Sequence, residues 1–162
     1  MLDQRRLLSN VRDAAHGADS VTDLFDDVCR AVVDGGADYA YVYATDVRAT
    51  AGIEDPSVST TPPDSGSVDR VDADPGRELH VPLSDGDDRH GTLAFAATDG
   101  IDADATAPLL DVGGTVALAA GKLEAEASMR DVRAELGVER RQFRKLHSVA
   151  AQMVGCEEEQ SI

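Results

Sequence analysis

The sequence of 162 residues has no tryptophan, three tyrosines and three phenylalanines, so aromatic side chains can supply only a small part of a hydrophobic core. Such a core has to rest on Val, Leu and Ala. Cysteine is also scarce: Cys29 and Cys156 are the two present, and they lie far apart in the sequence. This does not suggest the disulfide framework of a small secreted domain.

Long apolar runs are missing as well. No run approaches the roughly 20 residues that a transmembrane helix requires, and the N-terminus has no signal-peptide pattern. We therefore expect a cytoplasmic chain that makes no membrane contact through this segment. Lysine is nearly absent, with Lys122 and Lys145 beside 13 arginines. Acidic residues dominate instead: 22 Asp and 9 Glu give a formal net charge of −16.

This charge limits the partners of the chain. Nucleic acids and anionic membranes would repel it, so we expect no direct nucleic-acid partner. An aspartate-rich, lysine-poor composition is typical of proteins from salt-accumulating halophiles, in which dense salt screens the carboxylates from one another. A disordered acidic chain is the alternative interpretation, but a hydrophobic content of 42% in periodic blocks argues against it.

Two amphipathic helices are predicted at the start of the chain. The first covers residues 2–15 and is interrupted at Gly17. Asp19 or Ser20 then caps a second helix with a broad apolar face, which ends at the pair Gly35-Gly36.

Four later segments have the two-residue alternation of β-strands. They are residues 38–45, 47–53, 78–83 and 90–98. Tyr39, Tyr41 and Tyr43 share one face of the first of them. Residues 54–77 are acidic and contain several prolines, which predicts a loop with one short strand near residues 68–71. Pro82 suits an edge or an end of its strand.

The last third of the chain predicts a nearly proline-free helix from about Thr106 to Met153. Apolar residues between Leu109 and Leu123 recur at a spacing that suits packing on a globular body. The glycines in this part each lower helix propensity by about 1 kcal/mol. Close approach to the alanines of the first and last predicted strands would offset that cost. The residues concerned are Gly113, Gly114 and Gly121 in the helix, and Ala40, Ala44, Ala94 and Ala96 in the strands.

A second apolar stripe follows, in which the steps alternate between three and four residues except for a polar position at Glu139. This is the pattern of a coiled-coil heptad, and it predicts a homodimer. The residues of the predicted dimer seam are Met129, Val132, Leu136, Phe143, Leu146, Ala150 and Met153. Basic residues at 140–145 lie on the flanks of this seam, beside Glu135 and Glu139, where pairing charges belong.

The order of elements is therefore helix, helix, strand, strand, long loop, strand, strand, long helix. Strands joined by tight turns form an antiparallel sheet, and helices from both ends of the chain can cover one of its faces. The expected fold class is α+β.

This arrangement resembles a GAF domain, a sensory fold that binds small ligands. The resemblance covers about residues 8–130. It rests on the opening helices that end at Gly35-Gly36, the strand ADYAYVYAT, the strands LHVPL and HGTLAF, and the exit helix. It implies a noncatalytic sensory or relay module of a signal-transduction or transcription regulator, with an output domain in a longer protein. With the acidic composition, it is similar to the sensory regions of halophilic archaeal regulators, such as histidine kinases, transducer-like proteins and bacterio-opsin-activator-like proteins.

Four parts follow from this resemblance: an N-terminal helix at 1–17, a GAF-like sensory domain at 18–128, a coiled-coil signalling helix at 129–153, and the start of a second sensory repeat at 154–162. The repeat rests on an offset of 138 residues, which aligns Leu8 with Leu146 and Gly17 with Gly155. Two unrelated amphipathic helices can also match this well by chance.

The resemblance also implies a ligand pocket on the sheet. In ligand-binding GAF domains, the segment between the second strand and the last hairpin covers the sheet as a lid. Here that segment, residues 54–77, is short and acidic and has few large apolar groups. A pocket for a small molecule would be lined by Tyr39, Tyr41, Tyr43, Leu93 and Phe95. The alternative is that these side chains fill the space themselves. No cofactor is evident.

No catalytic motif is present, and we do not expect an enzyme. His147 lies on the predicted dimer helix, but Ser148 and Ala151 occupy the positions where the histidine-kinase motif has an acid and a proline. His80 and His90 lack a third ligand for a metal. Some GAF-fold proteins reduce free sulfoxides, but they use several converging cysteines. The alternative to a sensory or relay module is a structural dimerisation spacer with a degenerate pocket.

Overall fold

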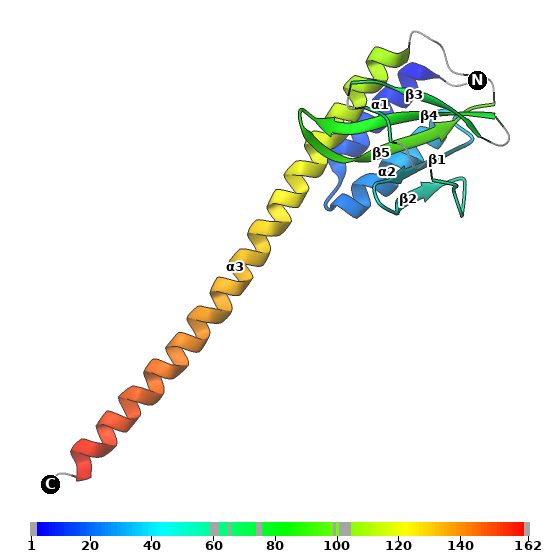
Figure 1. The fold of residues 1–162 in the computed structure, drawn as a ribbon. Coiled ribbons are helices and arrows are strands. Elements are labelled where there is room, and N and C mark those ends of the chain that lie inside the picture. The colour runs from blue at the N-terminus through cyan, green and yellow to red at the C-terminus, as the bar shows by residue number, and fades with distance from the viewer. Residues whose placement is uncertain are drawn as a thin grey trace. The chain divides into compact units, whose positions relative to one another are not determined.

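A computed structural model gives the fold of the chain (Figure 1). It describes residues 3–58, 62–64, 66–73, 76–98, 100 and 105–160, with the backbone alone at 76 and 155–160. The chain divides by its internal contacts into two compact units, Met1–Glu124 and Ala125–Ile162. The last two residues of the predicted second repeat, 161 and 162, lie outside the described residues.

Two helices open the first unit, and each begins at a side-chain cap. Helix α1 spans Gln4–Gly17, and the Asp3 carboxylate accepts a hydrogen bond of 3.2 Å from the Arg6 amide. Helix α2 spans Val21–Asp34, and the Ser20 hydroxyl oxygen accepts one of 3.1 Å from the Asp23 amide. These caps satisfy amides that a first helical turn leaves unpaired. Both predicted helices are confirmed, with Ser20 as the cap of the second.

The end of α2 is fixed by space as well as by backbone conformation. A β-carbon on Gly35 would lie 2.8 Å from the Cβ atom of Leu7 on α1, so only glycine lets the two helices approach this closely. Gly36 follows with a φ of 111°, a conformation that glycine adopts without strain. The predicted stop at this pair is therefore confirmed.

The sheet has five antiparallel strands in the order β2-β1-β5-β4-β3. The strands are β1 (Tyr39–Tyr43), β2 (Val47–Ala51), β3 (Asp69–Ala73), β4 (Gly76–Asp85) and β5 (Asp88–Ala96). The α+β fold class is confirmed, and β3 is the short strand predicted within residues 54–77. Pro82 suits its place because β3 pairs only with Gly76–His80 and leaves that part of β4 with one neighbour.

One face of the sheet carries the main hydrophobic core. The helices α1 and α2 and the first part of α3 (Thr106–Gln160) pack on it. Helices from before and after the strands therefore cover this face, as predicted. The sheet residues in this core are Ala40, Val42, Ala49, Leu79, Val81, Leu83, Leu93 and Phe95.

The part of α3 in the first unit packs through the predicted stripe, in which Leu109, Val112, Val116 and Leu123 are buried. A β-carbon on Gly113 would lie 2.5 Å from the carbonyl oxygen of Pro82. The close contact is thus made with β4. The expectation that these glycines pack on the alanines of β1 and β5 is wrong, because the backbone of β4 lies under Gly113 and the His90 side chain of β5 lies beside Gly121.

The second unit is formed by α3 from Ala125 onward. From Ala125 to Val154 every residue is exposed except Gly137, which is half-buried. In the described part of the chain, no helix has the length and apolarity needed to cross a membrane.

Candidate functional site

Five polar side chains gather on the face of the sheet opposite the helices. We call them the Tyr–Glu–His cluster: Tyr39, Tyr41 and Tyr43 from β1, and Glu78 and His80 from β4. Strand β5 runs between β1 and β4, and there it places Ala96 between Tyr39 and Glu78, and Ala94 between Tyr41 and His80. Because alanine leaves space above β5, the tyrosine rings reach across two strand spacings, roughly 10 Å, to the side chains of β4.

Glu78 is the centre of the cluster. Its Oε1 atom accepts a hydrogen bond from the Tyr39 hydroxyl at 2.6 Å, and its Oε2 atom accepts one from the Tyr41 hydroxyl at 2.8 Å. The Nε2 atom of His80 lies 3.0 Å from the same Oε2 atom. The Tyr43 hydroxyl then lies 2.8 Å from His80 Nδ1, so all five side chains form one connected network.

The hydrogen bonds keep Glu78 charged despite its burial, which leaves only 6% of the residue exposed. Burial acts to raise the pKa of this carboxyl, but the hydrogen bonds from His80, Tyr39 and Tyr41 outweigh it, and the pKa is lowered from its ordinary value. An ionised carboxylate can only accept, so His80 Nε2 donates to it. His80 Nδ1 can then accept the hydroxyl proton of Tyr43.

The tyrosines respond in the opposite direction. Burial, reinforced by the hydrogen bond and the charge of Glu78, raises the pKa of both Tyr39 and Tyr41. Burial also raises the pKa of Tyr43. The three phenols therefore stay protonated and act as donors.

The segment after β2 lies against this cluster. Ile53 packs on it, and the carbonyl oxygen of Ser57 is 3.4 Å from the Tyr41 hydroxyl. Tyr41, Tyr43 and His80 are each no more than 1% exposed. Among the described residues, no buried side-chain nitrogen or oxygen lacks a hydrogen-bond partner. The cluster thus has no unmet donor or acceptor for a ligand, which favours the alternative that the tyrosines fill the space themselves.

The five residues expected to line one pocket are divided between the two faces of the sheet. Tyr39, Tyr41 and Tyr43 lie together, as their shared face predicts, but Leu93 and Phe95 belong to the core under the helices. The reason is the register of β1 against β5, which pairs Leu93 with Val42 and Phe95 with Ala40. No single pocket on the sheet can therefore contain all five.

The sequence pattern did not indicate Glu78 and His80 as partners of the tyrosines. Both alternate with the apolar residues of their strand, which is the pattern of solvent-facing positions. The small side chains of Ala94 and Ala96 on β5 could have indicated these partners, because they leave room for larger side chains from the strands on either side.

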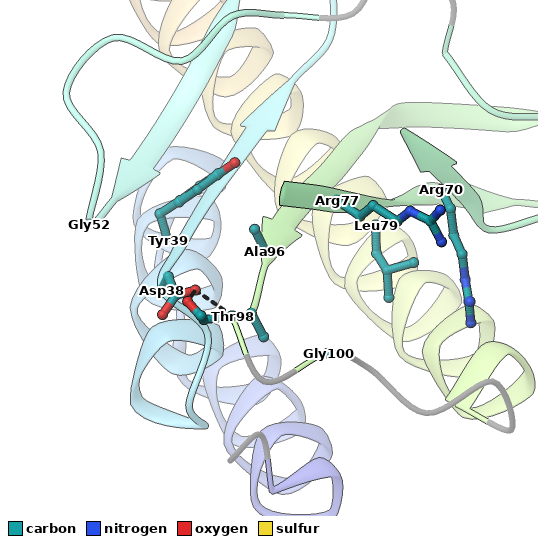
Figure 2. Close-up of a pocket in the computed structure, with 10 residues that line it drawn as sticks. Asp38, Tyr39, Gly52, Arg70, Arg77, Leu79, Ala96, Thr98 and Gly100 are labelled. Carbon is teal, nitrogen blue, oxygen red and sulfur yellow. Dashed lines mark hydrogen bonds between the residues drawn. The ribbon is translucent and has the colours of Figure 1, made fainter. Parts of the chain in front are cut away.

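A separate cavity of about 600 Å³ opens at the end of the sheet where β1 begins and β5 ends. Figure 2 shows Arg70 and Arg77 on one side of this cavity, and Asp38 and Thr98 on the other, with Leu79 on its wall. The Asp38 carboxylate is already engaged, because one of its oxygens accepts hydrogen bonds from the amide and the hydroxyl of Thr98, at 2.6 and 2.5 Å.

The cationic side of this cavity could hold an anionic group, since guanidinium groups bind carboxylates and phosphates. The Nε atom of Arg77 lies 3.3 Å from Asp72, and both side chains are largely exposed. Arg70 has no acidic partner within the described residues. The sequence did not predict this cavity, because its two arginines come from strands β3 and β4, whose pairing only the tertiary structure shows.

The other candidate residues lie apart. His80 belongs to the cluster, whereas His90 lies beside Gly121 of α3, with its Nδ1 atom 3.4 Å from Glu124. Within the described residues, no three His, Cys, Asp or Glu side chains are grouped to hold a metal ion. Cys29 is buried on α2, and burial, aided by the charge of Asp26, raises the pKa of its thiol to about 12.

The predicted seam residues all lie in the second unit and are exposed in the single chain. Among the large apolar residues of the seam, Phe143 and Leu146 are the most exposed, at 72% and 71%. The His147 ring stacks on Phe143, with ring centroids 6.4 Å apart and an angle of 10° between the planes. The pairing of two chains along this seam stays a prediction.

The fold is shared with solved GAF domains. The chain is similar to the GAF domain of a protein described as a sensor histidine kinase from Pseudomonas syringae pv. tomato, with a TM-score of 0.59 and 16% identity over 82% of this chain and 92% of that one. It is also similar to the GAF domain of a phosphoenolpyruvate-protein phosphotransferase from Acinetobacter, with a TM-score of 0.58 and 15% identity over 75% of this chain and 95% of that one. No family model and no curated protein matches the sequence.

Proposed function

We propose that this chain is a noncatalytic cytoplasmic sensory or relay module of a signalling or transcription regulator. It dimerises through α3 and passes conformational change to an output domain in a longer protein. The acidic, lysine-poor composition supports an origin in a halophilic archaeon. The fold supports the sensory role, because the similar solved structures are GAF domains and one of them is from a protein described as a sensor kinase.

The observation that carries the proposal is the exposed apolar stripe of the second unit. Six of its seven seam residues are large and apolar, and each is about half or more exposed. Each such side chain, if fully buried by a partner, would contribute roughly 1.5–3 kcal/mol. A heptad pattern of this kind has its apolar side covered when a second helix packs against it.

The dimer is tested by Leu136→Asp and Phe143→Asp, measured by light scattering in molar salt. A charge in the seam should convert the dimer into a monomer of 17.1 kDa, while circular dichroism shows that the first unit stays folded. Ser148→Asp is the matched control, because it adds the same charge outside the seam. A wild-type chain that is already monomeric would refute the proposed dimer.

The structural spacer is the second candidate, and the Tyr–Glu–His cluster favours it. A sheet face filled by its own hydrogen-bonded side chains has no room there for a small molecule. The cavity beside Arg70 and Arg77 favours the sensor instead, with a small anionic ligand. A sensor and a spacer therefore differ in whether anything binds at that cavity.

A thermal-shift screen in molar salt separates the two candidates. Nucleotides, haem precursors and aromatic acids are suitable probes, because a ligand that binds only the folded chain raises its melting temperature. A shift with any probe that disappears in Arg70→Ala supports a sensor that uses the cavity. The same melting temperature with every probe supports the spacer.

A further inference from the structure

The seam of the second unit also carries information on how two chains are oriented. In the heptad that its spacing defines, the central positions a and d are taken by two sets of residues. Position a holds Met129, Leu136, Phe143 and Ala150, and position d holds Val132, Glu139, Leu146 and Met153. The flanking positions e and g decide which arrangement of two helices is electrostatically favourable.

The flanks differ in charge. The e positions are Arg133, Arg140, His147 and Val154, and the g positions are Ser128, Glu135, Gln142 and Val149. All eight side chains are exposed in the single chain, so a partner can reach them. One flank therefore carries the positive charges of Arg133 and Arg140, whereas the other is neutral or acidic.

A parallel, in-register pair brings each g residue of one chain beside the e residue of the next heptad of the other. Glu135 then meets Arg140 of the second copy, and this contact forms twice by symmetry. The same rule places Val149 beside Val154 of the second copy, so two apolar residues meet. No pair of like charges arises on the flanks.

An antiparallel pair brings e beside e and g beside g. Alignment of the seam about its centre then sets Arg140 beside Arg140 of the second copy, and Glu135 near Val149. Like charges meet and a carboxylate faces an apolar side chain. In the seam itself, the parallel pair sets Glu139 against Glu139 of the second copy, and Arg140, which follows it in each chain, offsets this charge. On the flanks, charge complementarity favours the parallel arrangement.

We infer that the occupant of the seam is a second copy of this chain in a parallel, in-register two-stranded coiled coil, oriented by the pair Glu135–Arg140. The inference rests on the proposed dimer and adds its direction. A parallel pair places the two C-terminal ends of α3 together. Such an arrangement delivers the same movement to two output domains at one end of the rod.

Cysteine cross-linking of the full chain tests the direction. In a background with Cys156→Ser, Met153→Cys should form a disulfide with itself under mild oxidation, because d positions face each other in a parallel pair. Cys29 is buried and does not interfere. In an antiparallel pair, Met153 lies opposite Met129, about 36 Å from its own counterpart along the helix. A mixture of Met129→Cys and Met153→Cys chains would then cross-link.

The charge pair is tested by Glu135→Arg at the lowest salt at which the chain stays folded, since salt screens exposed pairs. This change should raise the dissociation constant of the dimer roughly three- to tenfold, and Arg140→Glu in the same chain should restore it. Asp131→Arg is the matched control, with the same charge change at an outer position. An effect of Glu135→Arg no greater than that of the control overturns the assigned pair.

These experiments distinguish failure of the parallel direction from failure of the proposed dimer. A dimer that cross-links only between Met129→Cys and Met153→Cys overturns the parallel direction and leaves the proposed dimer intact. A chain that is monomeric at all concentrations overturns both. Self-cross-linking of Met153→Cys, together with rescue of Glu135→Arg by Arg140→Glu, supports the inference.

Discussion

The hydroxyl of Tyr43 lies 2.8 Å from Nδ1 of His80, although 37 residues separate them in the sequence and strand β5 runs between their strands. This contact ends a chain of hydrogen bonds that begins at Tyr39 and passes through Glu78. A buried network of this kind stabilises one arrangement of the strands when every member has a partner. If one side chain of the network is removed, its neighbours stay buried without a hydrogen-bond partner.

Glu78→Gln should destabilise the first unit by about 1–3 kcal/mol. The carboxylate accepts through both oxygens, but the glutamine amide has one acceptor oxygen and one NH2 group. That NH2 group would face a hydroxyl or imidazole N–H that also donates, so a buried hydrogen bond would be lost. Denaturant unfolding in molar salt measures the loss. Glu126→Gln makes the same change at an exposed position and should shift the free energy of unfolding by less than about 0.5 kcal/mol. Equal effects of the two variants would show that the network adds no stability.

Low pH should lower the stability of the fold partly through protonation of Glu78. The pKa of Glu78 is lowered in the folded chain, so the folded state binds fewer protons here than the unfolded state, whose carboxyl titrates near 4.3. The stabilisation is therefore present above that pH and is lost as the pH falls through the folded pKa. Comparison with Glu78→Gln isolates this contribution from those of the other acidic residues. The difference in stability between wild type and variant should shrink with falling pH, and a constant difference would contradict the prediction.

Gly113→Ala should destabilise the packing of α3 on the sheet. The added β-carbon would lie 2.5 Å from the Pro82 carbonyl oxygen, which is backbone and cannot move aside easily. We expect a loss of about 1–3 kcal/mol, greater than the helix propensity gained from alanine. Gly137→Ala provides the comparison, since its nearest neighbour is the flexible end of Arg141 at 3.9 Å, and it should be neutral or stabilising. A stabilised Gly113→Ala chain would show that α3 does not pack this closely.

Cys29 should be unreactive toward thiol reagents in the folded chain. Its side chain is buried, and burial raises the pKa of the thiol to about 12, so neither access nor thiolate is available near pH 8. In a Cys156→Ser background, alkylation followed by mass spectrometry should find no modification until denaturant unfolds the first unit. Rapid modification of the native chain at pH 8 would contradict the assigned burial.

The local elements could be predicted because they depend on neighbours in the sequence. The Ser20 cap, the glycine pair that ends α2 and the alternation of the strands each satisfy a short-range requirement of the backbone. The heptad of α3 is also local, since it needs only the spacing of apolar residues from Met129 to Met153. Whether a second chain covers that heptad depends on another molecule.

The candidate site depended on contacts between distant residues. The alternation of residues within the first strand predicted that Tyr39, Tyr41 and Tyr43 share one face of the sheet. It did not predict that Leu93 and Phe95 lie on the opposite face. That division follows from the register of β1 against β5, which the sequence does not encode locally. For the same reason Gly113 was matched to the wrong strand.

The helices, the strands, the α+β class and the apolar seam could all be read from the sequence, because periodicity and capping act over a few residues. Which strands are neighbours became known from the folded structure. That order brought Glu78 and His80 within hydrogen-bond distance of the tyrosines, and Arg70 and Arg77 to one cavity. Hydrogen bonds and charges act over a few ångströms, so a chemical site exists only where the fold closes such distances.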